Sequence, residues 1–384
     1  MKIIGIYYLY HLLFFLVGLA IVREVGSRVF KRTCTHRFAV VIPAHNEQNV
    51  IKSSLRSIFS CDYPEDLFDV YVVADNCTDR TADAARAAGA RVLVRHDKNL
   101  RGKQHALKWA FQHILPDNSL DIYDAVVVLD ADNHVDPNFL RVLDGYLAEG
   151  HKVIQGYVET KNPCDSWVTA NYAYMFWYLC RLQMARTVLG LSAWLAGTGL
   201  CISTEVLRRV GWNVRTMTDD VEYTCQLILA GERVVFAPEA VVFDQKPVRL
   251  ADSMKQRLRW IRGQTQVSLR YIPRLLASVL RFSWRGNFGQ AARALDAVIW
   301  VPMHLVICAS VILLLCQGWW EYLLSVFLTV PVFNMLPMLA ERIKRCRTWA
   351  YLITAGAFFL TWLPITAYGV ISCGNKVWWR TPHV

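Results

Sequence analysis

The feature that most constrains this chain is the placement of its long apolar runs, which lie at the two ends and leave a more polar middle. Residues 3–22 form a run of about 20 residues, the length needed to cross a hydrocarbon core about 30 Å thick. Three further runs follow late in the chain, at residues 297–316, 322–340 and 349–372. Of the 384 residues, 54% are hydrophobic and only 19% are charged, which predicts one folded domain joined to a membrane part.

Basic residues predict the orientation of these runs. The first run is followed directly by Arg23, Arg28, Lys31, Arg32 and Arg37, and no small-residue cleavage site separates them from it. An excess of lysine and arginine marks the cytoplasmic side of a span, so this run is expected to be an anchor that leaves the following chain in the cytosol. Four spans also place the basic segment 341–348 in the cytosol. They leave Lys376 and Arg380 outside, so the last run is expected to span, or else to be re-entrant or interfacial.

The middle of the chain, residues 36–248, alternates short β-branched runs with polar stretches that suit helices. Strands are predicted at residues 38–42, 70–74, 91–94 and 125–130, with helices at residues 46–60, 81–88, 103–114 and 137–147. Such alternation predicts an α/β domain whose mostly parallel sheet is covered on both faces. The chain is therefore expected to comprise an N-terminal transmembrane helix (1–24), this cytoplasmic domain (36–248), amphipathic interface helices (249–290) and three C-terminal transmembrane helices (296–373).

Two segments between the sheet region and the late apolar runs are unusual. Residues 166–195 predict a long helix crowded with aromatic side chains, which suit core packing, a membrane face or a surface that stacks on sugar rings. Residues 249–290 mix arginines with leucines and tryptophans, as an amphipathic helix in the plane of the membrane interface does; a solvated charged face is the alternative. Membrane topology thus explains the net charge of +11, and no nucleic-acid motif is present. The eleven cysteines show no zinc spacing.

Acidic residues follow two of the predicted strands at the point where each strand ends. The run Val126–Leu129 ends in Asp130-x-Asp132, and an equivalent run ends in Asp75. Ligands of open α/β sheets gather beyond the carboxyl ends of the strands. Two carboxylates there suit Mg²⁺ or Mn²⁺ against the phosphates of a ligand, whereas a simple acidic turn is the alternative. Lys103, after Gly102 at a helix start, suits a phosphate as well.

Further motifs follow later in the chain. Gly197-Thr198-Gly199 interrupts an apolar stretch, and Thr218-Asp219-Asp220 opens a helix, where adjacent acids also serve as caps. Gln256-x-x-Arg259-Trp260 lies in the basic amphipathic segment, where arginine beside tryptophan is also typical of an interfacial anchor.

Taken in order, these motifs resemble those of the membrane-bound glycosyltransferase family 2, which includes cellulose, chitin, hyaluronan and poly-N-acetylglucosamine synthases. The resemblance covers residues 38–264 and rests on the following residues: Pro43-Ala44-His45-Asn46-Glu47, Asp75, Gly102-Lys103, Asp130-x-Asp132, Thr218-Asp219-Asp220 and Gln256-x-x-Arg259-Trp260. It implies a Rossmann-like GT-A fold, a nucleotide-sugar donor, a divalent cation and inversion at the anomeric carbon.

The resemblance also implies roles for individual residues. Asp220 would be the general base, with Asp219 beside it, and Asp132 would bind the cation. The nucleotide sugar would contact Pro43, Glu47, Asp75, Lys103, Asp130, Gln256, Arg259 and Trp260. The acceptor would lie near Gly197, Thr198, Gly199 and Trp260. The chain departs from the family at Ala74, where an acid is frequent, and at Asp219, where glutamate is usual.

The resemblance favours an inverting hexosyltransferase of the cell (inner) membrane that moves sugar from a UDP-sugar to a growing β-linked glycan, processively or not. A homo-oligomer or an export partner would help to line an export path, because four spans are few for one. Transfer of a single sugar to a membrane lipid is the enzymatic alternative. A non-catalytic membrane scaffold or channel is the alternative of another class, and it leaves unexplained why Asp75, Asp130, Asp132 and Asp220 are all acidic.

Overall fold

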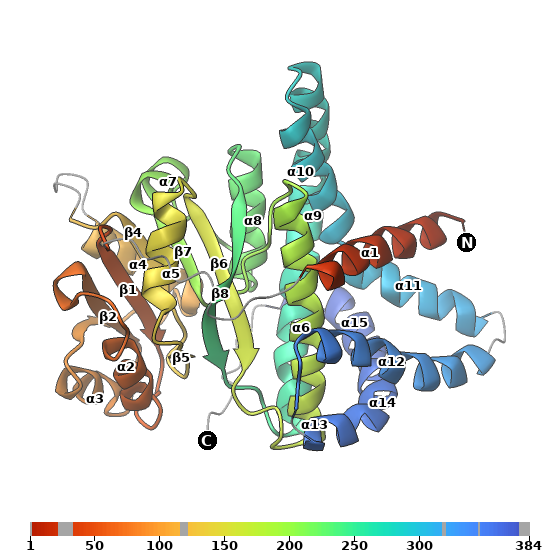
Figure 1. The fold of residues 1–384 in the computed structure, drawn as a ribbon, viewed down its shortest axis with the longest axis horizontal. Helices are drawn as coiled ribbons and strands as arrows, with labels where there is room; N and C mark the ends of the chain where they lie inside the picture. The colour runs from red at the N-terminus through yellow and green to blue at the C-terminus, as the bar shows by residue number, and fades with distance from the viewer. Residues whose placement is uncertain (1, 22–33, 116–121, 317–319, 345, 376–384) are drawn as a thin grey trace.

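The fold has two parts, a sheet domain and a layer of helices packed against one side of it (Figure 1). A computed structural model describes residues 2–21, 34–115, 122–316, 320–344 and 346–375. In Figure 1 the sheet domain lies on the left, α6 (Trp167–Val188) and α9 (Leu250–Trp284) stand beside it, and most of the other helices of the layer lie on the right. The functional motifs predicted from the sequence therefore belong to the sheet domain and to the helices that border it.

Four parallel strands form the first half of the sheet. They are β1 (Phe38–Ala44), β2 (Phe68–Asp75), β3 (Arg91–Arg95) and β4 (Ala125–Val128). β1 pairs in parallel with both β2 and β4, and β2 pairs in parallel with β3. Each strand begins and ends within two residues of its predicted bounds. The carboxyl ends of β1, β2 and β4 consequently meet at one edge, where the acidic motifs lie.

The second half of the sheet is mixed and was not predicted. It consists of β7 (Leu200–Ser203), β6 (Val153–Thr160), β8 (Val234–Asp244) and the short β5 (His134–Val135). β7 pairs antiparallel with β4 and β6, β6 pairs in parallel with β8, and β5 pairs antiparallel with β8. In the described residues the eight strands therefore form one sheet in the order β3-β2-β1-β4-β7-β6-β8-β5.

Helices cover both faces of the sheet, as period-two alternation within the strands requires. In β1, Val40 and Ile42 pack toward α2 (Ile51–Phe59) and α5 (Phe139–Ala148), whereas Ala39 and Val41 pack toward α4 (Lys103–Ile114) and α6. The helices around the sheet are α2 (Ile51–Phe59), α3 (Thr81–Ala87), α4 (Lys103–Ile114), α5 (Phe139–Ala148), α6 (Trp167–Val188), α7 (Thr204–Val210) and α8 (Asp219–Leu229). Every residue of β4 is buried, which explains its uniformly apolar sequence.

The aromatic helix α6 lies between the sheet and the helical layer. It begins with a capping box in which Ser166 and Thr169 hydrogen-bond reciprocally. It ends at Val188 rather than at residue 195, because Gly190 takes a positive φ of 75° and turns the chain away. Tyr174 and Trp177 are buried in the main core, so α6 uses these aromatic side chains for packing.

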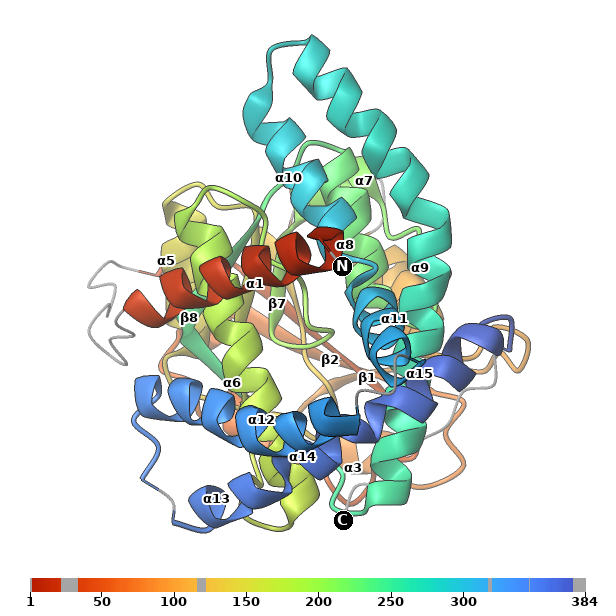
Figure 2. The same cartoon turned by 90° about the vertical axis from the view of Figure 1, so that its right-hand side faces the viewer.

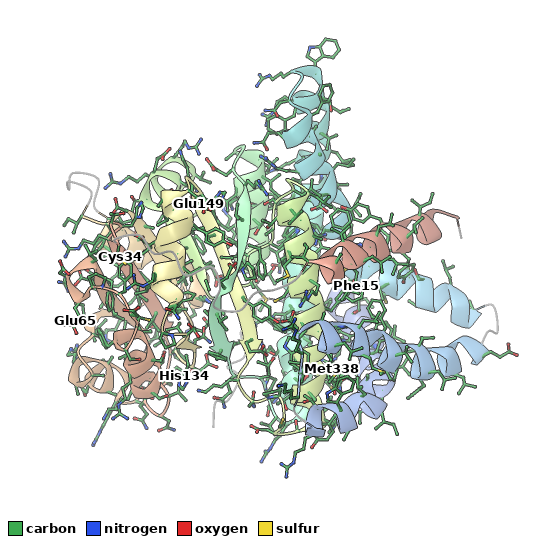
Figure 3. All side chains as sticks on the ribbon, viewed as in Figure 1. Phe15, Cys34, Glu65, His134, Glu149 and Met338 are labelled. Atoms are coloured by element: carbon green, nitrogen blue, oxygen red, sulfur yellow. The ribbon has the colours of Figure 1, made fainter. Side chains whose placement is uncertain are left out.

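The apolar ends of the chain form the helical layer, which Figure 2 shows face-on. Its helices are α1 (Lys2–Ala20), α9 (Leu250–Trp284), α10 (Phe288–Trp300), α11 (Met303–Cys316), α12 (Trp320–Ala340), α13 (Cys346–Ala350), α14 (Ala355–Leu360) and α15 (Trp362–Ile371). Phe15 of α1 and Met338 of α12 are fully buried where this layer meets α6 (Figure 3).

Buried ion pairs connect this layer to α6. Arg181 pairs with Glu341 at 2.5 Å and donates to the carbonyl of Ile21, just beyond α1, at 2.8 Å. Arg186 pairs with Asp296 of α10 at 3.0 Å. Both arginines are almost completely buried, so removing one partner would leave an uncompensated charge. The helices of the two chain ends are thus fixed against the sheet domain.

Four spans were predicted, and the described residues show fewer that qualify. By length and apolar composition, Arg347–Ile371 could cross a bilayer, and Phe288–Trp300 with Met303–Ser310 would be a second span if their 41° bend lies within one crossing. That bend falls at Pro302, which cannot continue the helical hydrogen bonding. The apolar helices Gly5–Ala20 and Val326–Ala340 are shorter. The multi-pass arrangement stays a prediction, and the basic residues between 22 and 33, Arg345, Lys376 and Arg380 lie outside the described residues.

Candidate active site

A cavity of about 570 Å³ lies at the carboxyl ends of β1, β2 and β4. Its walls come from β1, β2, the turn after β4, the start of α8 and the first turns of α9. Of the predicted site residues, it is lined by Pro43, Glu47, Asp75, Lys103, Asp130, Asp132, Gly197, Thr198, Asp219, Asp220, Gln256, Arg259 and Trp260. Gly199 does not line it; its amide and carbonyl pair with Val128 and Gly156 at the start of β7.

The turn that carries Asp130 and Asp132 is fixed by its neighbour Asn133, which is fully buried. The amide oxygen of Asn133 accepts from the backbone N–H of Asp130 at 3.1 Å and from the hydroxyl of Thr198. Its amide nitrogen donates to Asp132 at 3.3 Å and to Asp244 at 3.0 Å. Because the hydroxyl of Thr198 also accepts from the backbone N–H of Asp130 at 3.1 Å, Thr198 holds this turn in place.

Lys103 places a cation among the acids. Its ammonium donates to Asp130 at 2.5 Å and to the carbonyl of Gly197 at 2.7 Å. Burial alone would lower the pKa of Lys103, but the carboxylates of Asp130, Asp219 and Asp220 raise it above its ordinary value. Lys103 therefore stays charged and offsets the repulsion between these acids.

Asp219 and Asp220 occupy the first turn of α8, and both are half-buried. One oxygen of Asp220 accepts from the backbone N–H of Val221 at 2.8 Å. Burial, together with the charge of Asp219, raises the pKa of Asp220 to about 7, and burial raises the pKa of Asp219. A Cβ atom at Gly197 would lie 3.5 Å from the other oxygen of Asp220, so that oxygen faces the loop across the cavity. A carboxylate with this pKa can take up a proton near neutral pH.

The start of α9 contributes Gln256, Arg259 and Trp260, and Tyr172 of α6 positions two of them. The Tyr172 hydroxyl donates to Gln256 at 2.8 Å, and its ring lies edge-on to Trp260 with 5.9 Å between centroids. Arg259 makes no ion pair with a carboxylate in the described part of the chain, so its guanidinium is available to an anionic ligand. Sequence reasoning did not single out Tyr172, because one tyrosine among many aromatics in α6 carries no distinct signal.

Two residues that the sequence did not reveal hold α8 against α9. Glu222 is fully buried and accepts from the backbone N–H groups of Arg215 and Thr216 at 2.8 and 2.6 Å and from the hydroxyl of Tyr271 on α9 at 2.9 Å. Gly263 lies directly against the residue before Asp219, because a Cβ atom there would come within 2.7 Å of the Thr218 nitrogen. Asp219 and Asp220 are therefore held in a fixed position relative to the Gln256–Trp260 motif.

The ends of β1 and β2 form the remaining wall. Asp75 pairs with Arg95 of β3 at 2.6 Å, and its backbone carbonyl lies 2.7 Å from Nδ1 of His45. Burial raises the pKa of Asp75, while Arg95 opposes that rise. The backbone N–H of Glu47 donates to the hydroxyl of Thr81 at 2.8 Å, which joins the turn after β1 to the start of α3. The pairing of Arg95 with Asp75 could not be predicted from the sequence, because an arginine at the end of a half-exposed strand carries no distinct signal.

The side chains at the cavity would supply only some of the ligands of a divalent cation. In the described ranges no group of three or more His, Cys, Asp or Glu side chains could hold a metal ion. Mg²⁺ and Mn²⁺ suit sites with one or two carboxylates, the other ligands being water and substrate phosphates. Asp132 and Asp244 both line the cavity and share Asn133. Asp244 was missed, although the apolar run that ends in it has the pattern used to find Asp75 and Asp130.

Comparisons with known proteins agree with this arrangement. The family described as "Glycosyltransferase like family 2" matches residues 36–263, more than half of the chain. A probable glycosyltransferase, YdaM of Bacillus subtilis, is 24% identical over 259 residues, which cover 62% of this chain and 57% of that protein. The beta-monoglucosyldiacylglycerol synthase of Synechocystis is 29% identical over 246 residues, which cover 60% of this chain and 48% of that protein. The chain thus spans about half the length of these two relatives.

Longer similarity extends into the helical layer. The poly-beta-1,6-N-acetyl-D-glucosamine synthase of Staphylococcus epidermidis is 23% identical over 353 residues, which cover 86% of this chain and 80% of that protein. Among solved structures, the mannosyltransferase PcManGT from Pyrobaculum calidifontis, in complex with GDP-Man and Mn²⁺, superposes with a TM-score of 0.58 at 20% identity, covering 96% of this chain and 94% of that one. The predicted α/β GT-A fold is confirmed. The chain belongs to glycosyltransferase-like family 2.

Proposed function

We propose that this chain is a membrane-bound inverting glycosyltransferase that transfers a sugar from a UDP-sugar to a growing β-linked glycan. The observation that carries the proposal is that Asp75, Asp132, Asp220 and Arg259, from four separate segments of the sequence, line one cavity at the sheet edge. Family membership supports the reaction class, and the relatives discussed above support nucleotide-sugar chemistry.

The donor would be held by groups at the base and the mouth of the cavity. Asp75 and the turn after β1 would contact the nucleoside, while Lys103 and Arg259 would contact the diphosphate. A divalent cation at Asp132 would supply further positive charge to the leaving group. The mannosyltransferase complex, which contains Mn²⁺, supports the presence of such a cation. Cations placed in advance where negative charge develops have large effects on rate.

The transfer would be a single displacement at the anomeric carbon. The acceptor oxygen would form a bond to that carbon from the face opposite the diphosphate, the carbon–oxygen bond to the diphosphate would break, and the configuration would invert. Asp220 would take the proton of the acceptor hydroxyl, and its raised pKa of about 7 makes it an effective base near neutral pH. Trp260 and Gln256 would position the acceptor, supported by Tyr172.

A β-linked glycan is the first choice of acceptor, because similarity to the poly-N-acetylglucosamine synthase covers 86% of this chain. Glycan extension with export would require a homo-oligomer or an export partner, because the described part of the chain has few candidate spans. The second candidate is a membrane lipid, since similarity to the beta-monoglucosyldiacylglycerol synthase reaches 29% identity.

The same proposal places the chain in the cell (inner) membrane with its sheet domain in the cytoplasm. The apolar helices at both chain ends support it, with residues 1–24 and 296–373 in the bilayer and residues 249–290 at its interface. Residues 36–248 would then present the cavity to cytoplasmic nucleotide sugars.

The test is UDP release by the purified chain with a panel of UDP-sugars, offered either an oligosaccharide or diacylglycerol, followed by mass analysis of the product. Asp165→Asn changes an exposed acid outside the cavity and serves as the matched control for acid-to-amide variants of the cavity. Elongated oligosaccharide supports the first candidate, and glycosylated diacylglycerol supports the second. Failure of every UDP-sugar to react with either acceptor would contradict the proposal.

A further inference from the structure

The α9–α10 hairpin extends beyond the rest of the molecule, and the contact of α10 with the turn after α8 begins at Gln290, which donates to the carbonyl of Gly231. Figures 1 and 2 both show the hairpin projecting away from the sheet domain and from the other helices. A tight turn connects its two helices, and Gly286 in this turn has a φ of 72°. The side-chain oxygen of Asn287 caps α10 by accepting from the backbone N–H of Gln290 at 3.2 Å. Trp284, the last residue of α9, and Phe288, the first residue of α10, therefore lie on either side of this turn, which forms the tip of the hairpin.

The exposed side chains at this tip are large and apolar. Trp284 is 93% exposed and Phe288 is 72% exposed, one on each side of the turn. Leu269 and Leu280 are 71% and 73% exposed, and Leu276 is 47% exposed. Residues 269, 276, 280 and 284 fall on one face of α9, because their spacings of 7, 4 and 4 residues return close to the same helical angle. A continuous apolar stripe of this kind indicates a binding surface.

The charge of the hairpin indicates what binds there. No acidic residue occurs between Asp252 and Asp296, whereas Arg274, Arg281 and Arg285 are exposed cations of the hairpin. Arg285 directly follows the exposed Trp284, and Arg281 precedes it by three residues, which is about one turn of the helix. Two copies of such a surface would repel each other, so the face is not suited to self-association. An anionic surface that also accepts apolar side chains is its chemical complement.

The hairpin is also continuous with the apolar part of the chain. α10 leads through the 41° bend into the apolar helix α11, and the two together are long and apolar enough to cross a membrane. A surface directly adjoining that segment lies close to the plane of the headgroups. We infer that the end of the α9–α10 hairpin docks into an anionic lipid surface, with Leu280, Trp284 and Phe288 in the acyl boundary and Arg281 and Arg285 at the headgroups.

This inference rests on the membrane location in the proposed function, and it is tested without a sugar donor. The full-length chain is placed in nanodiscs of phosphatidylcholine and phosphatidylglycerol with p-benzoylphenylalanine at position 288, and photochemical adducts are identified by mass. The same residue at Ile312 of α11, which is 49% exposed, is the positive control for membrane embedding. The same residue at Phe59 of α2, which is 38% exposed in the sheet domain, is the negative control.

Lipid adducts at positions 288 and 312, but not at 59, are expected. Adducts at 312 without adducts at 288 would overturn the inference and leave the membrane location intact, whereas no adduct at either position would remove the membrane location itself. Crosslinks from 288 to a second copy of the chain or to another protein would also overturn it.

The role of the arginines is tested by a second variant, Arg281→Gln with Arg285→Gln. The preference of position 288 for phosphatidylglycerol over phosphatidylcholine should fall about five-fold for each arginine removed. An unchanged preference would overturn the assignment of anionic lipid. Retained binding of UDP by this variant shows that the chain is folded, because neither arginine lines the cavity.

Discussion

Replacement of Gly263 by alanine should displace the candidate base, Asp220, while changing the stability of the fold only a little. The new Cβ atom would lie 2.6 Å from the Thr218 methyl group and 2.7 Å from its backbone nitrogen. Ordinary contact begins at 3.4 Å, so α9 and the start of α8 must separate by about 0.7–0.8 Å. That separation moves Asp220 relative to Arg259, because Thr218 immediately precedes the acidic pair.

The expected effect is large on the rate and small on stability. A misplacement of about 1 Å in a catalytic arrangement costs on the order of 10²-fold, so kcat should fall roughly ten- to hundred-fold. Overpacking costs about 1–3 kcal/mol, but removing a glycine from a helix interior returns up to about 1 kcal/mol. The melting temperature should therefore change much less than kcat, and the affinity for UDP should stay close to that of the wild type.

The assay is steady-state UDP release together with thermal unfolding and UDP titration. Gly289→Ala in α10 is the matched control, since a Cβ atom there meets nothing within 4 Å, and it should leave kcat unchanged. Thr218→Ala in the Gly263→Ala background removes two of the three clashing atoms and should restore part of the rate. A Gly263→Ala variant with wild-type kcat would refute the claim that the α8–α9 contact sets the register of the site.

Three further predictions concern the acids of the cavity. The kcat of the wild type should fall as the pH drops below about 7, because Asp220 is then protonated. Asp219→Asn removes the neighbouring charge that raises the pKa of Asp220, so it should move this fall in kcat to lower pH. A pH profile unchanged by Asp219→Asn would contradict this prediction. Because the pKa of Asp220 is raised from 3.8 to about 7 on folding, its contribution to stability is present at low pH and is lost as the pH rises through 7. Asp220→Asn should therefore stabilise the chain increasingly from pH 4 to about pH 7 in thermal unfolding, and a difference that stays constant over this range would contradict the raised pKa of Asp220. Asp132→Ala should weaken Mn²⁺ binding in the presence of UDP, followed by electron paramagnetic resonance, and unchanged Mn²⁺ affinity would exclude it as a ligand.

The half of the sheet with simple alternation could be predicted from the sequence, and the other half could not. β1 to β4 are buried β-branched runs separated by amphipathic helices, so their pattern was distinct. β6, β7 and β8 pair across long intervals and partly antiparallel, which no local pattern records. The end of α6 was placed too late because one glycine with positive φ outweighed an apolar sequence that continues beyond it.

The site divides in a similar way. Residues that a ligand would touch carry strong local signals, an acid at a strand end or an arginine beside a tryptophan, and the cavity is lined by them. Residues that hold those groups carry no such signal, because their partners are distant in sequence. Glu222 reaches Tyr271 across 49 positions, and Asn133 reaches Asp244 across 111. Only the folded chain shows that these contacts fix the acids in place.

The central claim is that Asp220 takes the acceptor proton in a cavity that binds the nucleotide independently of it. The most direct test measures sugar transfer and UDP affinity in the same preparation of Asp220→Asn. The account predicts transfer reduced by about 10²–10⁴-fold, with UDP affinity close to that of the wild type. Near-normal transfer by this variant would contradict the account.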